Sequence, residues 1–132
     1  MKNAMDKEKF LIEYDFKKVS PTLLWNFIST SVGLEEWFAD KVVNEDKQYT
    51  FYWNKNPQTA LLVGSRVGVF VRFHWLDDTE GKTFFEMRIT SSELTGATML
   101  SVTDFADSDE LEDLRELWDN EIERLQRRLG VL

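Results

Sequence analysis

The 132-residue sequence predicts one α+β domain over residues 1–132, in which a curved antiparallel sheet wraps around a long C-terminal helix. Three observations predict this fold. Apolar and polar residues alternate with a period of two over most of residues 41–105, as in half-buried strands. An apolar stripe with steps of three and four residues ends the chain, as in an amphipathic helix. The length is typical of a single domain with its own core.

The first expected elements are a strand and a pair of helices. Residues 10–16 alternate, and the apolar side chains of Phe10, Ile12, Tyr14 and Phe16 share one face. Ser20-Pro21 predicts a helix start, because serine caps a helix well and proline suits the first helical position. We expect this helix to end at Gly33, and residues 34–38 to form a second helical turn with its apolar members on one face.

The middle of the chain is expected to form a meander of strands, with turns at residues 44–47, 54–57 and 77–82. A symmetric turn at 77–82 would pair residue 73 with 85, residue 71 with 87, and Arg72 with Glu86 on the opposite face. The two glycines within residues 64–68 predict an interruption or bulge. Residues 98–105 form the last strand, whose inward-facing side chains the pattern does not identify.

The final helix has the clearest pattern. Its apolar stripe consists of Leu111, Leu114, Trp118, Ile122, Leu125 and Leu129. Asp107 or Ser108 is expected to cap its start, and Gly130 follows its end. At 1.5 Å per residue the helix would be roughly 30 Å long, enough to cross a small sheet.

Composition excludes several classes of function. The net charge of −8, from 24 acidic and 16 basic residues, repels a phosphate backbone, so nucleic acid is not expected as a partner. Cysteine is absent, which rules out disulfides and thiolate chemistry and suits a cytoplasmic protein. Residues 1–9 lack the apolar core of a signal peptide, and no stretch approaches the roughly 20 apolar residues of a membrane span.

Short motifs in this order resemble the START-like (SRPBCC) superfamily, which has the helix-grip fold. Residues 20–28 (SPTLLWNFI) and 33–39 (GLEEWFA) are similar to its helix pair, residues 70–75 (FVRFHW) to a strand ending in tryptophan, and Leu117-Trp118 to its closing helix. The match is strongest to small bacterial START-like domains and to homologues of the heat-shock ATPase activator. The resemblance implies a cavity between the sheet and the closing helix, which in relatives holds lipids, polyketides or hormones, or stays unused.

The leading hypothesis is a domain that binds an apolar or amphipathic, lipid-like molecule in this cavity without transforming it. Aromatic and aliphatic side chains are expected to converge between sheet and helix as cavity residues: Trp37, Phe38, Phe51, Trp53, Val71, Phe73, Phe85, Met87, Leu114, Trp118 and Ile122. A protein-interaction module is the alternative, and a homodimer is compatible with either. A cyclase-like enzyme comes third, because it needs an acid or base inside the cavity.

Other candidate chemistry is sparse, so no cofactor, metal or catalytic residue is assigned. His74 is the only histidine, and it alternates with Phe73 and Trp75, which places it on the outer face of the sheet without an evident partner. The motifs of a nucleophile elbow, a zinc protease or a phosphate-binding loop do not occur. Arg72, Glu86 and Arg88 are expected to form a solvated cross-strand ladder of weak ion pairs.

Overall fold

The computed structural model describes residues 7–79 and 81–132. Over these residues the chain forms a sheet, two short helices and a long terminal helix. In chain order the elements are β1 (Glu8–Asp15), α1 (Pro21–Ser29), α2 (Ser31–Leu34), β2 (Lys41–Glu45), β3 (Gln48–Trp53), β4 (Asn56–Arg66), β5 (Phe70–Trp75), β6 (Phe85–Ser91), β7 (Thr98–Ala106) and α3 (Leu111–Arg128). The α+β fold predicted from the sequence is confirmed.

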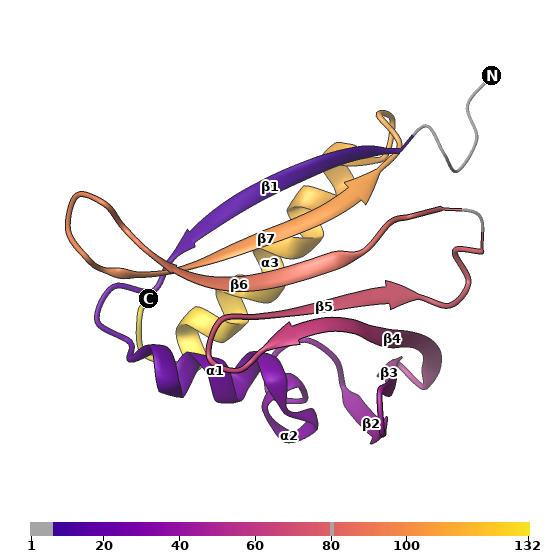
Figure 1. Cartoon of the computed structure of the whole chain (residues 1–132), viewed down its shortest axis with the longest axis horizontal. Helices are drawn as coiled ribbons and strands as arrows, with labels where there is room; N and C mark the ends of the chain where they lie inside the picture. Colours follow the sequence, from indigo (N-terminus) through magenta and orange to yellow (C-terminus); the bar gives the residue numbers. More distant parts are fainter. Residues whose placement is uncertain (1–6, 80) are drawn as a thin grey trace.

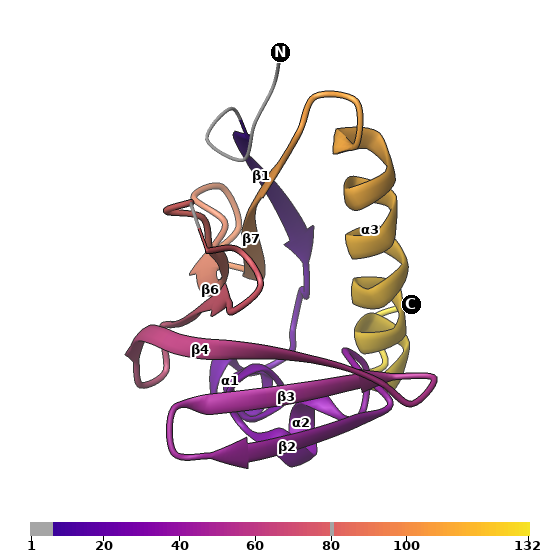
Figure 2. The same cartoon turned by 90° about the vertical axis from the view of Figure 1, so that its right-hand side faces the viewer.

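The strands form one antiparallel sheet in the order β1-β7-β6-β5-β4-β3-β2. The chain runs as a meander from β2 to β7, and β1 pairs with β7 at the far edge, so the first strand lies beside the last (Figure 1). Figure 2 shows the sheet bent, with β1, β7 and β6 along one side and β4, β3 and β2 across the other, and α3 standing in the angle between them. Helix α3 contacts the part of the sheet formed by β1, β7 and β6, through Tyr14, Asp104 and Phe85.

The strand register agrees with the pattern of residues. In the β5–β6 pair, Val71 lies opposite Met87, and Arg72 lies opposite Glu86 on the other face. Each face therefore pairs side chains of compatible chemistry, which stabilises that register. The expected irregularity is a register shift between Leu62 and the following Gly64 in the β4–β5 pair.

The sequence pattern did not identify which side chains of β7 point inward, but the pairing of β7 with β6 does. Val102 lies opposite Met87, whose side chain is fully buried, so the even-numbered residues of β7 point toward α3. Leu100 and Val102 fill the core at this face. Asp104, two residues further on, therefore points inward as well.

The predicted end of the first helix is wrong. Helix α1 ends at Ser29, and Gly33 lies inside α2, where it has no left-handed conformation. A Cβ on Gly33 would overlap the carbonyl oxygen of Asn26 and come within 2.7 Å of the Cα of Phe27. Glycine is needed here because α2 folds back tightly onto α1, and Thr30 caps the new turn by accepting a hydrogen bond from the Gly33 N–H at 2.9 Å.

Helix α3 keeps its predicted stripe but not its predicted cap. Trp118, Ile122 and Leu125 are buried against the sheet. The N-cap is Glu110, without a side-chain capping bond, instead of Asp107 or Ser108. At the other end Gly130 adopts a positive φ of 76°, and the chain closes the helix as expected. Within the described residues, no helix is long and apolar enough to cross a membrane.

Candidate functional site

An apolar hollow of about 480 Å³ lies between α3 and the sheet and is open to solvent. It is built from the loop before β2, the strands β3 to β7 and one face of α3. Its lining residues are Phe38, Trp53, Gln58, Trp75, Phe85, Asp104, Leu114, Leu117, Trp118 and Glu121. A hollow of this size is within the usual range of small-molecule sites.

The structure divides the predicted cavity residues into two groups. Five of them line the hollow: Phe38, Trp53, Phe85, Leu114 and Trp118. Six others are buried in the surrounding core and do not line it: Trp37, Phe51, Val71, Phe73, Met87 and Ile122. Trp37 illustrates why, since its indole N–H donates to the carbonyl oxygen of Phe27 at 2.9 Å and ties the loop to the end of α1. The alternation of residues along a strand shows which face a side chain is on, but not whether it packs in the core or lines a cavity on that face.

Aromatic rings form the floor of the hollow. The ring of Phe38 lies at the centre, 5.7 Å from the Trp118 ring and 5.8 Å from the Phe85 ring, measured between centroids. Trp75 stacks on Phe85 at 4.9 Å, and the Trp53 ring lies 6.2 Å from that of Trp75. These rings pack against one another, and Trp53 and Trp75 are the partly exposed members, whereas Phe38, Phe85 and Trp118 are buried.

Asp104 brings a carboxylate to this apolar surface. Its Oδ2 accepts a hydrogen bond from the Trp118 indole N–H at 2.8 Å, and its Oδ1 accepts one from the backbone N–H of Phe105 at 2.7 Å. Burial raises the pKa of Asp104 to about 6, although these two hydrogen bonds and the charge of Lys7 act in the opposite direction. Asp104 thus fixes the Trp118 ring and keeps a charge at the edge of the hollow at neutral pH.

Glu121 is the second acid of the hollow. It lies on the buried face of α3 with 5% of its surface exposed. Its pKa is raised to about 8, chiefly by burial; the charge of Arg124 lowers it and the nearby Asp104 raises it. No ion pair within 4 Å joins Glu121 to another residue in the described part of the chain. Its carboxyl group is therefore mostly protonated at pH 7.

Sequence reasoning missed both acids and three further lining residues. Glu121 follows Trp118 by three positions, so a single acid inside an apolar helical stripe was the available signal. Trp75 shares the face of Phe73 and could have been included by the same parity argument. Asp104, Gln58 and the half-exposed Leu117 gave no such signal, because their placement depends on strand pairing and on the path of α3.

The ladder of ion pairs on the outer face of the sheet is less exposed to solvent than the sequence predicted. Glu86 is buried, with 6% exposed, beneath Arg72 at 2.7 Å and Arg88 at 3.1 Å. The guanidinium of Arg72 lies 4.3 Å from the Phe84 ring, and that of Arg88 lies 4.3 Å from the Phe70 ring. Burial raises the pKa of Glu86, but the hydrogen bonds from Arg88 and Arg72 outweigh it and leave the pKa below its usual value.

His74 lies on this outer face, as predicted, and not in the hollow. It is half-buried, and its Nδ1 is 2.7 Å from the carbonyl oxygen of Thr83, a partner that the sequence pattern did not identify. The contact joins β5 to the segment before β6. His74 is therefore a structural residue of this edge and is not placed to act on a molecule in the hollow.

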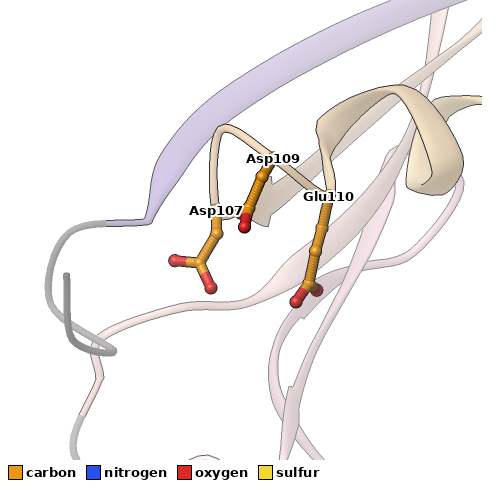
Figure 3. Close-up of side chains that lie close together, drawn as sticks. All are labelled: Asp107, Asp109 and Glu110. Carbon is orange, nitrogen blue, oxygen red and sulfur yellow. The ribbon is translucent and has the colours of Figure 1, made fainter.

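A cluster of three carboxylates lies at the turn between β7 and α3. The carboxylates of Asp107, Asp109 and Glu110 come within 4.8 Å of one another and extend to the same side of the turn (Figure 3). Asp109 and Glu110 are exposed. Acids gather at helix starts because the helix dipole favours negative charge there, so α3 explains this cluster without a metal ion.

Several solved protein structures have an architecture similar to that of this chain. A protein from Bacteroides fragilis, solved by NMR in solution, shares 46% sequence identity over 94% of this chain and 92% of its own, with a TM-score of 0.66. The Aha1 dimer from Colwellia psychrerythraea shares 15% identity over 95% and 96% of the two chains, with a TM-score of 0.73. DynU16, from the dynemicin biosynthetic locus, shares 16% identity over 95% of this chain and 47% of its own, with a TM-score of 0.72.

The last two similarities concern the fold alone. No curated protein matches the chain. A family model for START-like superfamily domains matches residues 4–131, which is nearly the whole sequence. Together with the bent sheet around a closing helix, this match shows that the chain belongs to the START-like superfamily.

Proposed function

We propose that this domain binds an apolar or amphipathic small molecule in the hollow between the sheet and α3, without transforming it. The observation that carries the proposal is that side chains leave about 480 Å³ open against a floor of aromatic rings. Clefts of this size that are lined mainly by apolar and aromatic side chains, with a few polar groups, are typical of small-molecule sites. A molecule with a flat apolar body would fit against these rings.

The residues proposed to contact the ligand are those that line the hollow. Phe38, Trp53, Phe85 and Trp118 would pack against its apolar body, and Leu114 would cover it from α3. Trp75 joins this set. The six predicted residues that lie in the core are proposed to act only by holding these walls in place.

A second candidate function is acid–base catalysis, and the two acids of the hollow favour it. At pH 7 Glu121 would be able to donate a proton, while Asp104 would be able to accept one. The protein-interaction alternative is less favoured because it does not explain the open hollow. A homodimer stays a proposal, for which the dimeric Aha1 neighbour from Colwellia psychrerythraea is the precedent.

The proposed function is tested with N-phenyl-1-naphthylamine, a neutral probe whose fluorescence rises in apolar sites. We expect saturable binding to the wild-type protein, and loss of binding in Leu114→Trp, which fills the hollow from α3. The matched control is Leu11→Trp, which makes the same change on an exposed position of β1. Absence of saturable binding to the wild type, or equal loss in both variants, would contradict the proposal.

A further inference from the structure

The titratable groups that line the hollow are both acids, and we propose that it selects cationic ligands, namely an ammonium group attached to an apolar body, over anionic ones such as fatty acids. Asp104 comes from β7 and Glu121 from α3. Among the described lining residues there is no lysine, arginine or histidine. The inference rests on the proposed function, because it names the chemical class of the ligand in the same hollow.

The aromatic floor suits a cation as well as an apolar ligand. An ammonium group is attracted to the faces of aromatic rings, most strongly to tryptophan, when it lies within about 6 Å of the ring centre. Three tryptophans line the hollow: Trp53, Trp75 and Trp118. The Trp118 ring is held by its hydrogen bond to Asp104, so a ring and a carboxylate are presented together. That combination of aromatic faces with nearby carboxylate is how proteins recognise ammonium groups.

The basic residues nearest to the two acids do not neutralise them. Lys7 acts on Asp104, and Arg124 acts on Glu121, but neither lines the hollow or forms an ion pair with these acids. The Nε of Arg124 instead donates to the carbonyl oxygen of Trp37 at 3.3 Å. A cationic ligand would supply the missing countercharge, whereas a carboxylate ligand would be repelled. The net charge of −8 also favours the approach of cations over that of anions.

The proposal makes the affinity for a permanent cation depend on pH in a defined direction. The groups facing Glu121 are Asp104, Arg124 and, from β1, Tyr14; Lys7 and Glu121 face Asp104. Asp104 and Glu121 ionise as the pH rises through about 6 and about 8, and each ionisation adds a negative charge to the hollow. Binding of a quaternary ammonium should therefore tighten between pH 5 and pH 8 and release protons.

The test uses three probes that share a benzyl group and differ in charge: benzyltrimethylammonium, its neutral isostere neopentylbenzene, and phenylacetate. Dissociation constants are measured at pH 5 and pH 8, together with proton release in buffers of different ionisation enthalpy. We expect the ammonium probe to bind about tenfold more tightly than the neutral isostere at pH 8, with phenylacetate weakest. Its affinity should fall about tenfold at pH 5, while that of the neutral probe should not change.

The double variant Asp104→Asn/Glu121→Gln should reduce the preference for the ammonium probe to about twofold or less and abolish its pH dependence. Glu116→Gln is the matched control, because it removes one acid from the exposed side of the same helix. If the neutral isostere or phenylacetate binds as tightly as the ammonium probe, the inference is overturned and the proposed function stands. If none of the probes, N-phenyl-1-naphthylamine included, binds to the wild type, both are overturned.

Discussion

Trp118 connects the closing helix to the sheet in two ways, through packing and through a hydrogen bond. It is 4% exposed, contacts the Phe38 and Phe85 rings, and donates its indole N–H to Asp104. Removing the ring leaves a void and an unpaired carboxylate, so Trp118→Ala should lower the free energy of unfolding by roughly 3–5 kcal/mol. Urea denaturation measures this. Leu117→Ala, on the same helix but half-exposed, is the control and should cost much less.

A midpoint for Trp118→Ala within error of the wild type would show that α3 does not pack on the sheet through this residue. The same stripe was readable in the sequence, because steps of three and four residues return to one side of a helix. Its polar member, Glu121, was not recognised. Its position three residues after Trp118 places it on the same side of the helix, but an acid at such a position is usually assigned to the solvated face.

Glu121 also sets a pH dependence of stability. Its pKa is raised from the usual 4.5 to about 8 in the folded protein, so the folded state binds more protons than the unfolded chain over that range. Stability should therefore fall as the pH rises from 5 to 8, by at most about 1.4 kcal/mol per pH unit. Asp104 adds to this fall between its usual 3.8 and about 6.

Urea midpoints at pH 5 and pH 8 test this account. The Glu121→Gln variant should lose less stability over this range than the wild type and should be the more stable of the two at pH 8. Asp78 and Glu86, whose pKa values are lowered, titrate below this window and do not affect the comparison. A wild-type stability that is unchanged or rises between pH 5 and pH 8 would contradict the burial of Glu121.

At the scale of elements, the junction of α1 and α2 depends on a single glycine. Gly33→Ala should destabilise the protein by about 1–3 kcal/mol, because its Cβ would overlap the backbone of α1 at Asn26. Gly64→Ala is a suitable control, since its Cβ would meet ordinary contacts of 3.6 Å or more. Thermal unfolding of both variants checks this, and equal effects would show that α2 does not close onto α1 as described.

The strands and the long helix could be predicted from local pattern, whereas the connections between them could not. Arg72 opposite Glu86 followed from alternation and a symmetric turn, both of which are local. The prediction that Gly33 ends the first helix in a left-handed conformation was wrong. Glycine also occurs where two backbones come close, and only the packing of α2 onto α1 shows that this is the reason here. The inward orientation of Asp104 could be recognised only from the pairing of β7 with β6.

At the scale of the whole molecule, the acidic charge predicts which partners are excluded. With a net charge of −8, the protein should not retard a DNA or RNA probe in a gel at low salt, because binding to phosphates requires a basic surface. A tight, salt-sensitive complex would contradict this. The paired Arg72 and Arg88 do not form such a surface, since both are bound to Glu86.

The hollow itself is a property of the whole fold. It lies between the bent sheet, the loop that carries Phe38, and α3. Because these segments are far apart in the sequence, no local pattern of residues predicts the space between them. Val71 and Met87, which the sequence predicted as cavity residues, lie in the packed core, so Val71→Phe or Met87→Trp would not fill the hollow. Those variants should cost about 1–3 kcal/mol by overpacking, whereas Leu114→Trp addresses the hollow directly.

The most direct test of the proposed binding site is an NMR titration of the ¹⁵N-labelled protein with N-phenyl-1-naphthylamine, following the indole N–H signals of its five tryptophans. Trp53, Trp75 and Trp118 line the hollow, whereas Trp25 and Trp37 do not. We expect saturable shifts of the first three signals with one dissociation constant, and little change in the other two. Absence of saturable shifts, or shifts confined to Trp25 and Trp37, would contradict it.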